Sequence, residues 1–249
     1  MTSTAPADTR REINPANEVA TSLVCDTSHL PALPCGWTVR EYSFGDRTLK
    51  LTVPGRPDAL LEGSEVRAAN DRDDYMPYWA YLWPAAIYMS RAVLLADWSE
   101  GTRVLELGCG VGLIGVAARA KGCRVTMTDY DASSVAVAQH NARLNGFDDV
   151  EACVLDWRTP PSKTYPVILG CDLLYEQRNL VPILDLLEVM LEPGGLCWLA
   201  DGGRKVAHQF WYLARERGFT LTMRDTEGTE ITAPGLRYQL FELRRPVRG

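Results

Sequence analysis

From Gly101 onward, short apolar runs alternate with stretches of helical periodicity, and this alternation constrains the fold more than any other feature. The apolar runs lie at 104–107, 125–128, 150–155, 167–171 and 196–200, and the helical stretches lie near 112–121, 131–145, 178–191 and 204–217. Strands that alternate with helices are joined by right-handed crossovers, which gives a mostly parallel sheet covered on both faces. These five runs predict an α/β fold with a Rossmann-like, doubly wound sheet, and the two runs described next bring the expected sheet to seven strands.

Two further apolar runs close the chain and break this alternation. They lie at 219–223 and 238–243, with no clear helix between them. Parallel strands need a long crossover, usually a helix, whereas antiparallel strands do not. We expect an antiparallel pair of strands at the C-terminal end of the sheet.

The N-terminal part of the chain has a different composition. Residues 1–35 are rich in Thr, Ala, Pro, Asn and Asp, which predicts a flexible N-terminal tail. Residues 36–76 form a predicted extension with a β-hairpin, because the alternating runs 37–44 and 48–53 flank a Gly-Asp turn. This extension precedes the predicted domain of 77–249.

The predicted domain is long enough to hold a sizeable hydrophobic core. The whole chain has 249 residues, of which 46% are hydrophobic, and this suits one domain plus an extension. Trp83-Pro84 begins a predicted helix with proline in its first turn.

Charge and cysteine usage exclude several classes of protein. The formal net charge of -6 argues against a general nucleic-acid-binding protein, which needs a basic face. No apolar run approaches a membrane span, and we see no secretory signal. The seven cysteines include no C-x-x-C pair, and the three histidines complete no zinc pattern. We expect a cytoplasmic protein that binds no metal ion, no nucleic acid and no membrane.

Three glycines follow the strand at 104–107, in Glu106-Leu-Gly-Cys-Gly-Val-Gly112. Glycine lets the backbone turn sharply and approach a ligand without a Cβ clash. In an open parallel sheet, ligands bind outside the carboxyl ends of the strands. The next two strands end at Asp129, which can accept the hydroxyls of a ribose, and at Asp156-Trp157, which can flank an adenine. Together these residues predict a nucleotide-like ligand.

Each of these features also has a simpler interpretation. The glycines can permit close packing, Asp129 can cap the following helix, and Trp157 can be a surface-lining aromatic residue. The three features occur at the ends of three successive strands, however, and this coincidence favours a ligand site.

A dinucleotide oxidoreductase is the rival interpretation. Gly110-Val-Gly-Leu-Ile-Gly115 matches the dinucleotide pattern G-x-G-x-x-G, and Asp129 follows at about the right distance. Glu106 argues against it, because its carboxylate would lie close to a pyrophosphate but would suit a cationic sulfonium or ammonium group. The antiparallel C-terminal pair also leaves no second mononucleotide half. S-adenosylmethionine is therefore the expected cofactor.

Three segments resemble a known family. The stretch 106–115 resembles motif I of the seven-β-strand methyltransferases. The stretch 78–86, Tyr-Trp-Ala-Tyr-Leu-Trp-Pro-Ala-Ala, resembles the tryptophan segment of the methyltransferase-16, lysine-methyltransferase-like family, and Asp172-Leu-Leu-Tyr175 resembles its D-x-x-Y motif. The similarity covers roughly residues 77 to 245. It looks closest to the branch that methylates the electron-transfer flavoprotein β subunit.

The resemblance assigns roles to matching residues. It implies that Trp83 lines the cofactor pocket, that Cys109 and its flanking glycines approach the methionine part, and that Cys171 contacts the cofactor. The full expected cofactor-binding set is Trp83, Glu106, Gly108, Cys109, Gly110, Gly112, Asp129, Tyr130, Asp156, Trp157 and Cys171.

Methyl transfer to an amine also needs groups that orient the acceptor. A lysine ammonium has no lone pair, so it must lose a proton before it attacks the methyl group. We expect Asp172 to anchor the amine and Tyr175 to act as a ring wall or hydroxyl acceptor, because in a helical turn residues three apart face the same way. The alternative is that Asp172 caps a turn and Tyr175 packs under a loop.

Two aromatic residues are candidates for binding the substrate. Trp79 and Tyr81 are expected to line the opening for an aliphatic chain, since aromatic walls attract a methylammonium group. The alternative for both is ordinary core packing.

The expected function is S-adenosylmethionine-dependent N-methylation, with a protein lysine side chain as acceptor. A small-molecule amine is the alternative acceptor, as in an enzyme similar to nicotinamide N-methyltransferase. A non-catalytic protein that binds the cofactor is a further alternative, and the intact acidic residues weigh against it. A nucleic-acid methyltransferase is disfavoured because Asp172-Leu-Leu-Tyr175 stands where an N-P-P-Y-type tetrad would be needed.

Overall fold

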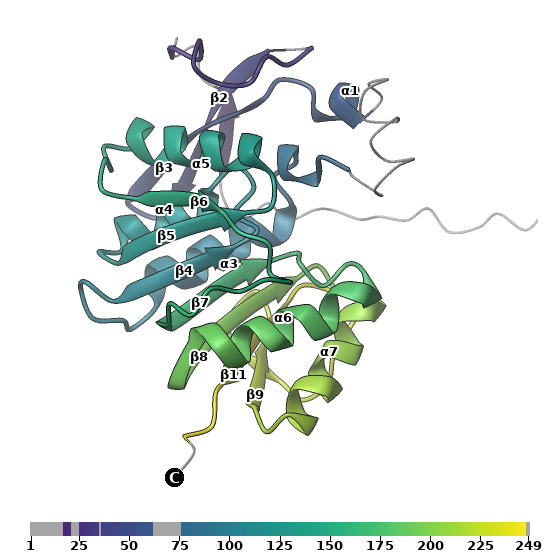
Figure 1. Cartoon of the computed structure of the whole chain (residues 1–249). Helices are drawn as coiled ribbons and strands as arrows, with labels where there is room; N and C mark the ends of the chain where they lie inside the picture. The colour runs from purple at the N-terminus through teal and green to yellow at the C-terminus, as the bar shows by residue number, and fades with distance from the viewer. Residues whose placement is uncertain (1–16, 21–24, 35, 62–75, 248–249) are drawn as a thin grey trace, which may run out of the picture.

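An eight-stranded sheet forms the centre of the computed structural model, which describes residues 17–20, 25–34, 36–61 and 76–247 (Figure 1). In spatial order its strands are β10 (Glu230–Ile231), β9 (Thr220–Arg224), β11 (Gln239–Arg244), β8 (Leu191–Asp201), β7 (Tyr165–Cys171), β4 (Arg103–Leu107), β5 (Arg124–Asp129) and β6 (Glu151–Val154). The five strands from β8 to β6 run parallel to one another. The predicted α/β fold with a mostly parallel sheet is therefore confirmed.

The C-terminal strands are antiparallel, as predicted. β11 pairs with β9, but it also pairs with β8, so it joins the pair to the parallel strands. The two-residue strand β10 pairs with β9 and extends the expected seven strands to eight.

Helices cover both faces of this sheet (Figure 1). The helices α3 (Pro84–Leu95), α4 (Leu113–Ala120) and α5 (Ala132–Leu144) contribute to one hydrophobic cluster, and α6 (Gln177–Met190) and α7 (Lys205–Glu216) contribute to the other. The last four begin and end within two residues of the predicted helical stretches, because their periodic apolar positions are the ones buried against the sheet. No helix among the described residues is long and apolar enough to cross a bilayer.

The predicted β-hairpin is present. It consists of β2 (Trp37–Phe44) and β3 (Arg47–Pro54), and Gly45 in its turn has φ +64°. A third strand, β1 (Asn17–Ala20), pairs antiparallel with β2. β1 lies within the predicted flexible tail, so the sequence analysis missed it. The rest of that tail lies partly outside the described residues, at 1–16, 21–24 and 35.

Two short helices lie between the hairpin and α3, the first in the predicted extension and the second in the predicted domain. These are α1 (Pro57–Leu61) and the 3-10 helix η1 (Tyr78–Ala80), which directly precedes α3. Residues 62–75 of the predicted extension lie outside the described part of the chain.

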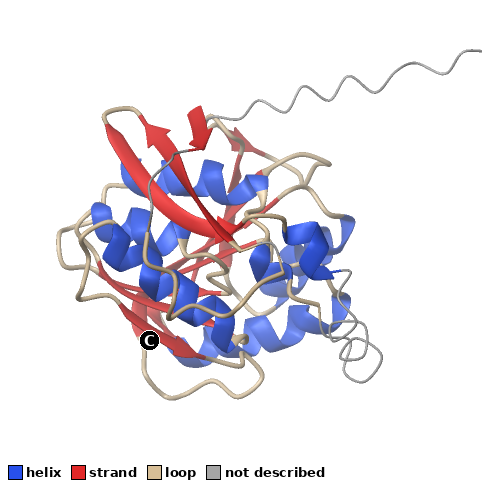
Figure 2. Cartoon of the chain, turned by 90° about the horizontal axis from the view of Figure 1, so that it is seen from above, coloured by secondary structure: helices blue, strands red, loops and turns tan. Residues whose placement is uncertain are grey.

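Two asparagines one helical turn apart attach the N-terminal sheet to α5. Asn141 accepts a hydrogen bond from the Thr52 N–H (2.7 Å) and donates to the carbonyl oxygens of Thr52 (2.9 Å) and Val111 (2.8 Å). Asn145 makes the corresponding pair of bonds with the backbone of Lys50. The edge of β3 is thus satisfied by side chains of a helix, and Figure 2 shows this sheet lying across the helices.

Candidate active site

A cavity of about 860 Å³ opens at the carboxyl ends of the parallel strands, and we call it the carboxyl-edge cavity. It is lined by the residues that follow β4, β5, β6, β7 and β8, together with the segment from Met76 to Ala86. All of the predicted site residues line it except Glu106 and Gly112. The parallel sheet brings these residues together because all of its strand ends lie at one edge.

The glycine loop after β4 has the backbone that the sequence analysis expected. Gly108, Gly110 and Gly112 have φ values of +60°, +53° and +86°. A Cβ on Gly108 would overlap Leu173, and a Cβ on Gly112 would lie 2.9 Å from the Cβ of Ala138. Both glycines therefore permit close packing, and Gly108 and Gly110 also line the cavity, whereas Gly112 does not.

Glu106 lies beneath the glycine loop and does not line the cavity. Side chains alternate along β4, and this one is 1% exposed, with its Oε2 atom 2.5 Å from where a Cβ of Gly115 would stand. Burial raises the pKa of Glu106 well above its ordinary value, although the backbone of Gly115 donates a hydrogen bond to it. Oε2 has no hydrogen-bond partner among the described residues. The structure thus does not bring Glu106 into the predicted position beside the ligand.

Asp129 joins the loop to the end of β5. Its Oδ2 atom accepts from the Gly110 N–H and its Oδ1 atom accepts from the Asp131 N–H, both at 3.0 Å. Each carboxylate oxygen has a second lone pair, so both can still accept a hydroxyl from the cavity. The helix cap considered for Asp129 is instead supplied by Asp131, which accepts from the Ser133 N–H at 2.7 Å.

The end of the cavity near β6 is built around an ion pair. Arg158 holds Asp156 through Nε at 2.8 Å and Nη2 at 2.7 Å, and this hydrogen bonding lowers the pKa of Asp156. The guanidinium of Arg158 also lies 5.5 Å from the ring centroid of Tyr130. Trp157 lines the same end and is half-buried. The sequence analysis missed Arg158, although it directly follows Asp156-Trp157.

Aromatic rings form another wall of the cavity. Tyr78 lies edge-on to Tyr175, with ring centroids 5.6 Å apart, and Tyr81 lies 5.6 Å from Trp83. Trp79 lines the cavity but is 9% exposed and packs on Trp37 of the extension. Trp79 therefore belongs both to the core and to the cavity wall, and its contact with a substrate stays a prediction. The sequence analysis did not single out Tyr78.

Asp172 and Tyr175 both line the cavity, but the expected helical turn is absent. α6 begins only at Gln177, and Asp172 has φ +55°. Its Oδ1 atom accepts from Arg204 and from the Gly202 N–H (3.4 Å). Burial raises the pKa of Asp172, while Arg204 acts in the opposite direction.

Tyr175 and Cys171 line the same cavity as neutral groups. Burial raises the pKa of Tyr175 to about 12, so its hydroxyl stays protonated at neutral pH. Burial also raises the pKa of the Cys171 thiol, which donates to the Oδ2 atom of Asp172 at 3.6 Å. Neither group can serve as a base at neutral pH.

Two charged residues lie at the end of β8, and of these Arg204 lines the cavity whereas Asp201 lies behind it. Asp201 is fully buried, and its Oδ2 atom accepts from Arg204 Nη1 at 3.0 Å. The guanidinium of Arg204 lies 5.4 Å from the ring centroid of Trp83. Neither residue was predicted, although a place at the end of a parallel strand was the signal that had identified Asp129.

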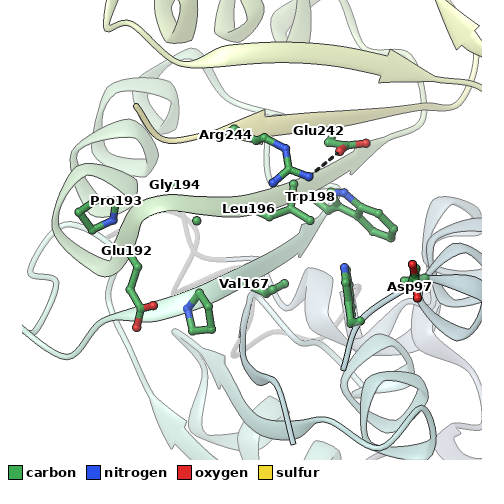
Figure 3. Close-up of a pocket in the computed structure, with 13 residues that line it drawn as sticks. Asp97, Val167, Glu192, Pro193, Gly194, Leu196, Trp198, Glu242 and Arg244 are labelled. Carbon is green, nitrogen blue, oxygen red and sulfur yellow. Dashed lines mark ion pairs between the residues drawn. The ribbon is translucent and has the colours of Figure 1, made fainter. Parts of the chain in front are cut away.

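A second cavity, of about 460 Å³, lies near the opposite edge of the sheet (Figure 3). Residues at the starts of β7 and β8 and the end of α3 line it, with an ion pair of 3.6 Å between Arg244 and Glu242. None of the predicted site residues lies there. The carboxyl-edge cavity is therefore the candidate active site.

Comparison with known proteins gives one family. The family model described as lysine methyltransferase matches residues 68–213. Protein N-lysine methyltransferase METTL21A of Danio rerio is 31% identical over 150 residues, which are 55% of this chain and 69% of that protein. The electron transfer flavoprotein beta subunit lysine methyltransferase of Danio rerio is 30% identical over 103 residues, which cover 41% of this chain and 40% of that protein.

A solved structure confirms the architecture. The ribosomal protein L11 methylase of Lactobacillus delbrueckii subsp. bulgaricus has a TM-score of 0.55 and 17% sequence identity. The match covers 67% of this chain and 81% of that one. At this identity the likeness supports the fold alone.

Proposed function

Because the chain belongs to the lysine methyltransferase family and is an S-adenosylmethionine-dependent methyltransferase, we propose that it methylates a lysine side chain of a protein. The two relatives described above carry lysine methyltransferase names, which supports this acceptor. Because these relatives are only 30–31% identical to this chain, the side chains of the cavity must also support a lysine acceptor.

The donor set of the cavity fits S-adenosylmethionine. Asp129 has free lone pairs for the ribose hydroxyls, and the loop around Gly108 and Gly110 presents backbone without Cβ atoms to the methionine part. Trp157 and Tyr130 offer aromatic surfaces for the adenine. When bound, the cofactor supplies a sulfonium methyl group that an amine takes by in-line displacement.

The acceptor is proposed to enter between the aromatic rings and Asp172. Tyr78, Tyr81 and Trp83 form an aromatic wall that suits the aliphatic stem of lysine and its methylated ammonium. Asp172 accepts a hydrogen bond from the amine and orients it. Asp172 would hold the amine with its lone pair toward the donor methyl group, and the proton lost by the original ammonium would pass to solvent.

One observation carries the proposal. The Asp172 carboxylate and the aromatic wall open into the same cavity as Asp129 and the glycine loop. Positioning of two reactants in one water-poor cavity is the main contribution an enzyme makes to such a displacement.

The location of the activity is also a proposal. The cysteines in the described residues are all free, which fits the reducing environment of the cytoplasm. We propose that the enzyme methylates its acceptor protein in the cytoplasm.

The test is incubation of the purified protein with methyl-labelled donor and a host lysate that is then separated by size. Label in a discrete protein band, recovered as methyllysine after hydrolysis, is the expected result. Label confined to the small-molecule fraction would show that the acceptor is not a protein.

A further inference from the structure

We propose that Arg204 is a positioning residue that holds Asp172 by one carboxylate oxygen, leaving the other to accept from the methyl acceptor. The inference rests on the proposed function of the carboxyl-edge cavity. It assigns a role to a residue that precedes α7 and follows β8.

Contacts with several side chains hold Arg204 in place. Its Nη1 atom donates to Oδ1 of Asp172 and to Oδ2 of Asp201. Asp201 is itself fixed, because it is fully buried and its Oδ1 atom accepts from the N–H groups of Gly203 (2.7 Å) and Arg204 (2.6 Å). The guanidinium also lies against Trp83. One cation is thus fixed between two carboxylates and an indole.

The two oxygens of Asp172 are used unequally. Oδ1 accepts from Arg204 and from the Gly202 N–H, whereas Oδ2 accepts the weak hydrogen bond of the Cys171 thiol. Asp172 also has φ +55°, a conformation that aspartate tolerates better than most residues. Among the partners of this carboxylate, Arg204 is the charged one.

The charges around Asp172 give Arg204 a second consequence. Cys171 from β7, Asp201 from β8 and Tyr238 from the segment before β11 are neutral or negative groups that face this carboxylate. Burial raises the pKa of Asp172, and the nearby Asp201 raises it further. Arg204 acts in the opposite direction and lowers the pKa of Asp172. Without Arg204, the proton would stay on Asp172 to higher pH, and a protonated carboxyl loses much of its capacity to accept from an amine.

α7 offers a matched control at its other end. Arg217 also contacts two carboxylates, Asp185 at 2.5 Å and Glu188 at 3.6 Å, and its side chain is 26% exposed against 29% for Arg204. Arg217 does not line the cavity. Arg217→Gln therefore removes an arginine that contacts two more exposed carboxylates at the other end of α7, without touching Asp172.

The first test needs no methyl acceptor. The carboxyl carbon of Asp172 is followed by ¹³C NMR as a function of pH in the full-length protein, with Asp172→Asn used to assign its signal. The midpoint is expected to rise by about one pH unit or more in Arg204→Gln, and to stay unchanged in Arg217→Gln. An unchanged midpoint in Arg204→Gln would overturn the inference.

The second test measures methyl transfer to the labelled acceptor. We expect Arg204→Gln to lower kcat at least 10-fold, to move the acidic limb of its pH profile to higher pH, and to change the Kd for S-adenosylmethionine less than about 2-fold. Arg204→Lys keeps the charge but not the planar fork, and should recover part of kcat and the original pH profile. A uniform loss of activity with an unmoved pH profile would mean that Arg204 is only structural.

The two tests separate the two proposals. Failure to find a protein acceptor would contradict the proposed function, but the NMR titration would still show whether Arg204 controls Asp172. An acceptor that is methylated equally well by Arg204→Gln would leave the proposed function intact and reject the role of Arg204.

Discussion

Asp129 connects the glycine loop to the proposed cofactor site through a single side chain. It accepts hydrogen bonds from the backbone of Gly110 and Asp131 and lines the cavity with its remaining lone pairs. We expect Asp129→Ala to weaken S-adenosylmethionine binding about 10- to 100-fold, because it removes acceptors for the ribose and loosens the loop. Calorimetry measures the Kd. The control is Asp149→Ala, because Asp149 forms a surface ion pair with Arg119. Equal affinities in both variants would contradict this role.

Glu106 predicts a pH dependence of stability. Its folded-state pKa is raised well above 4.5 by burial, so the folded protein holds this proton more tightly than the unfolded chain does. Its contribution to stability therefore falls as the pH rises from about 4.5 through the raised pKa. Glu106→Gln removes the charge, and we expect it to stabilise the cofactor-free protein by about 1 kcal/mol or more at pH 8 and by little near pH 4.5.

Chemical denaturation of both proteins across this pH range measures the effect of Glu106→Gln. A difference that grows toward low pH would have the wrong sign and would refute the assignment of a buried, proton-holding carboxyl.

At this scale the sequence predicted residues whose position follows from the ends of strands. Asp129, Trp157 and Asp172 could be placed because parallel strands end at one edge of the sheet. Glu106 was misplaced, because the direction of a side chain depends on the alternation along β4 and not on proximity to the glycines. Arg204 was missed because its role depends on contacts with Asp172 and Asp201, which are far from each other in sequence.

At the scale of elements, α5 couples the N-terminal sheet to the glycine loop. Asn141 bonds to the backbone of both Thr52 and Val111, whereas the strand contact of Asn145 is with Lys50 alone. We expect Asn141→Ala to cost about 2–4 kcal/mol of unfolding free energy, because it leaves buried backbone groups without partners, and also to weaken cofactor binding. Asn145→Ala should cost about 1 kcal/mol and leave cofactor affinity unchanged.

Urea denaturation and calorimetry on the two asparagine variants distinguish these outcomes. If both variants lose the same stability and neither loses cofactor affinity, α5 does not transmit order to the loop.

Some helices and strands could be predicted from their sequence better than others. Long helices and buried strands carry enough periodic apolar residues to be recognised alone. β1 and β10 have only four and two residues, and such short strands owe their existence to β2 and β9, their pairing partners. The turn from Asp172 to Tyr175 was also beyond the pattern, because a few residues between β7 and α6 fit several conformations.

At the scale of the whole molecule, the extension shares the core of the catalytic domain. Tyr42 and Leu51 of the hairpin belong to the same hydrophobic cluster as Val116 and Val137 of α4 and α5. The division into an extension and a domain at residue 76 stays a prediction about the sequence, and the packing argues that the two fold together.

Leu51→Ala tests this shared core. Leu51 is fully buried, so we expect a loss of about 2–5 kcal/mol in a single cooperative unfolding transition. The unfolding transition followed by circular dichroism of the whole protein should coincide with the transition followed by a fluorescence probe on the hairpin, which carries Trp37. Two separated transitions would show that the extension unfolds by itself.

Methyl transfer to the acceptor by the wild-type protein and by Asp172→Asn tests whether the carboxyl-edge cavity methylates lysine. With methyl-labelled S-adenosylmethionine and peptide mass spectrometry, the wild-type protein should place the label on a lysine of a protein acceptor. Asp172→Asn should slow that transfer at least 10-fold while it binds the cofactor with nearly unchanged Kd, because Asp172 contacts the acceptor in this account. Label on a group other than lysine, or unchanged transfer by Asp172→Asn, would contradict it.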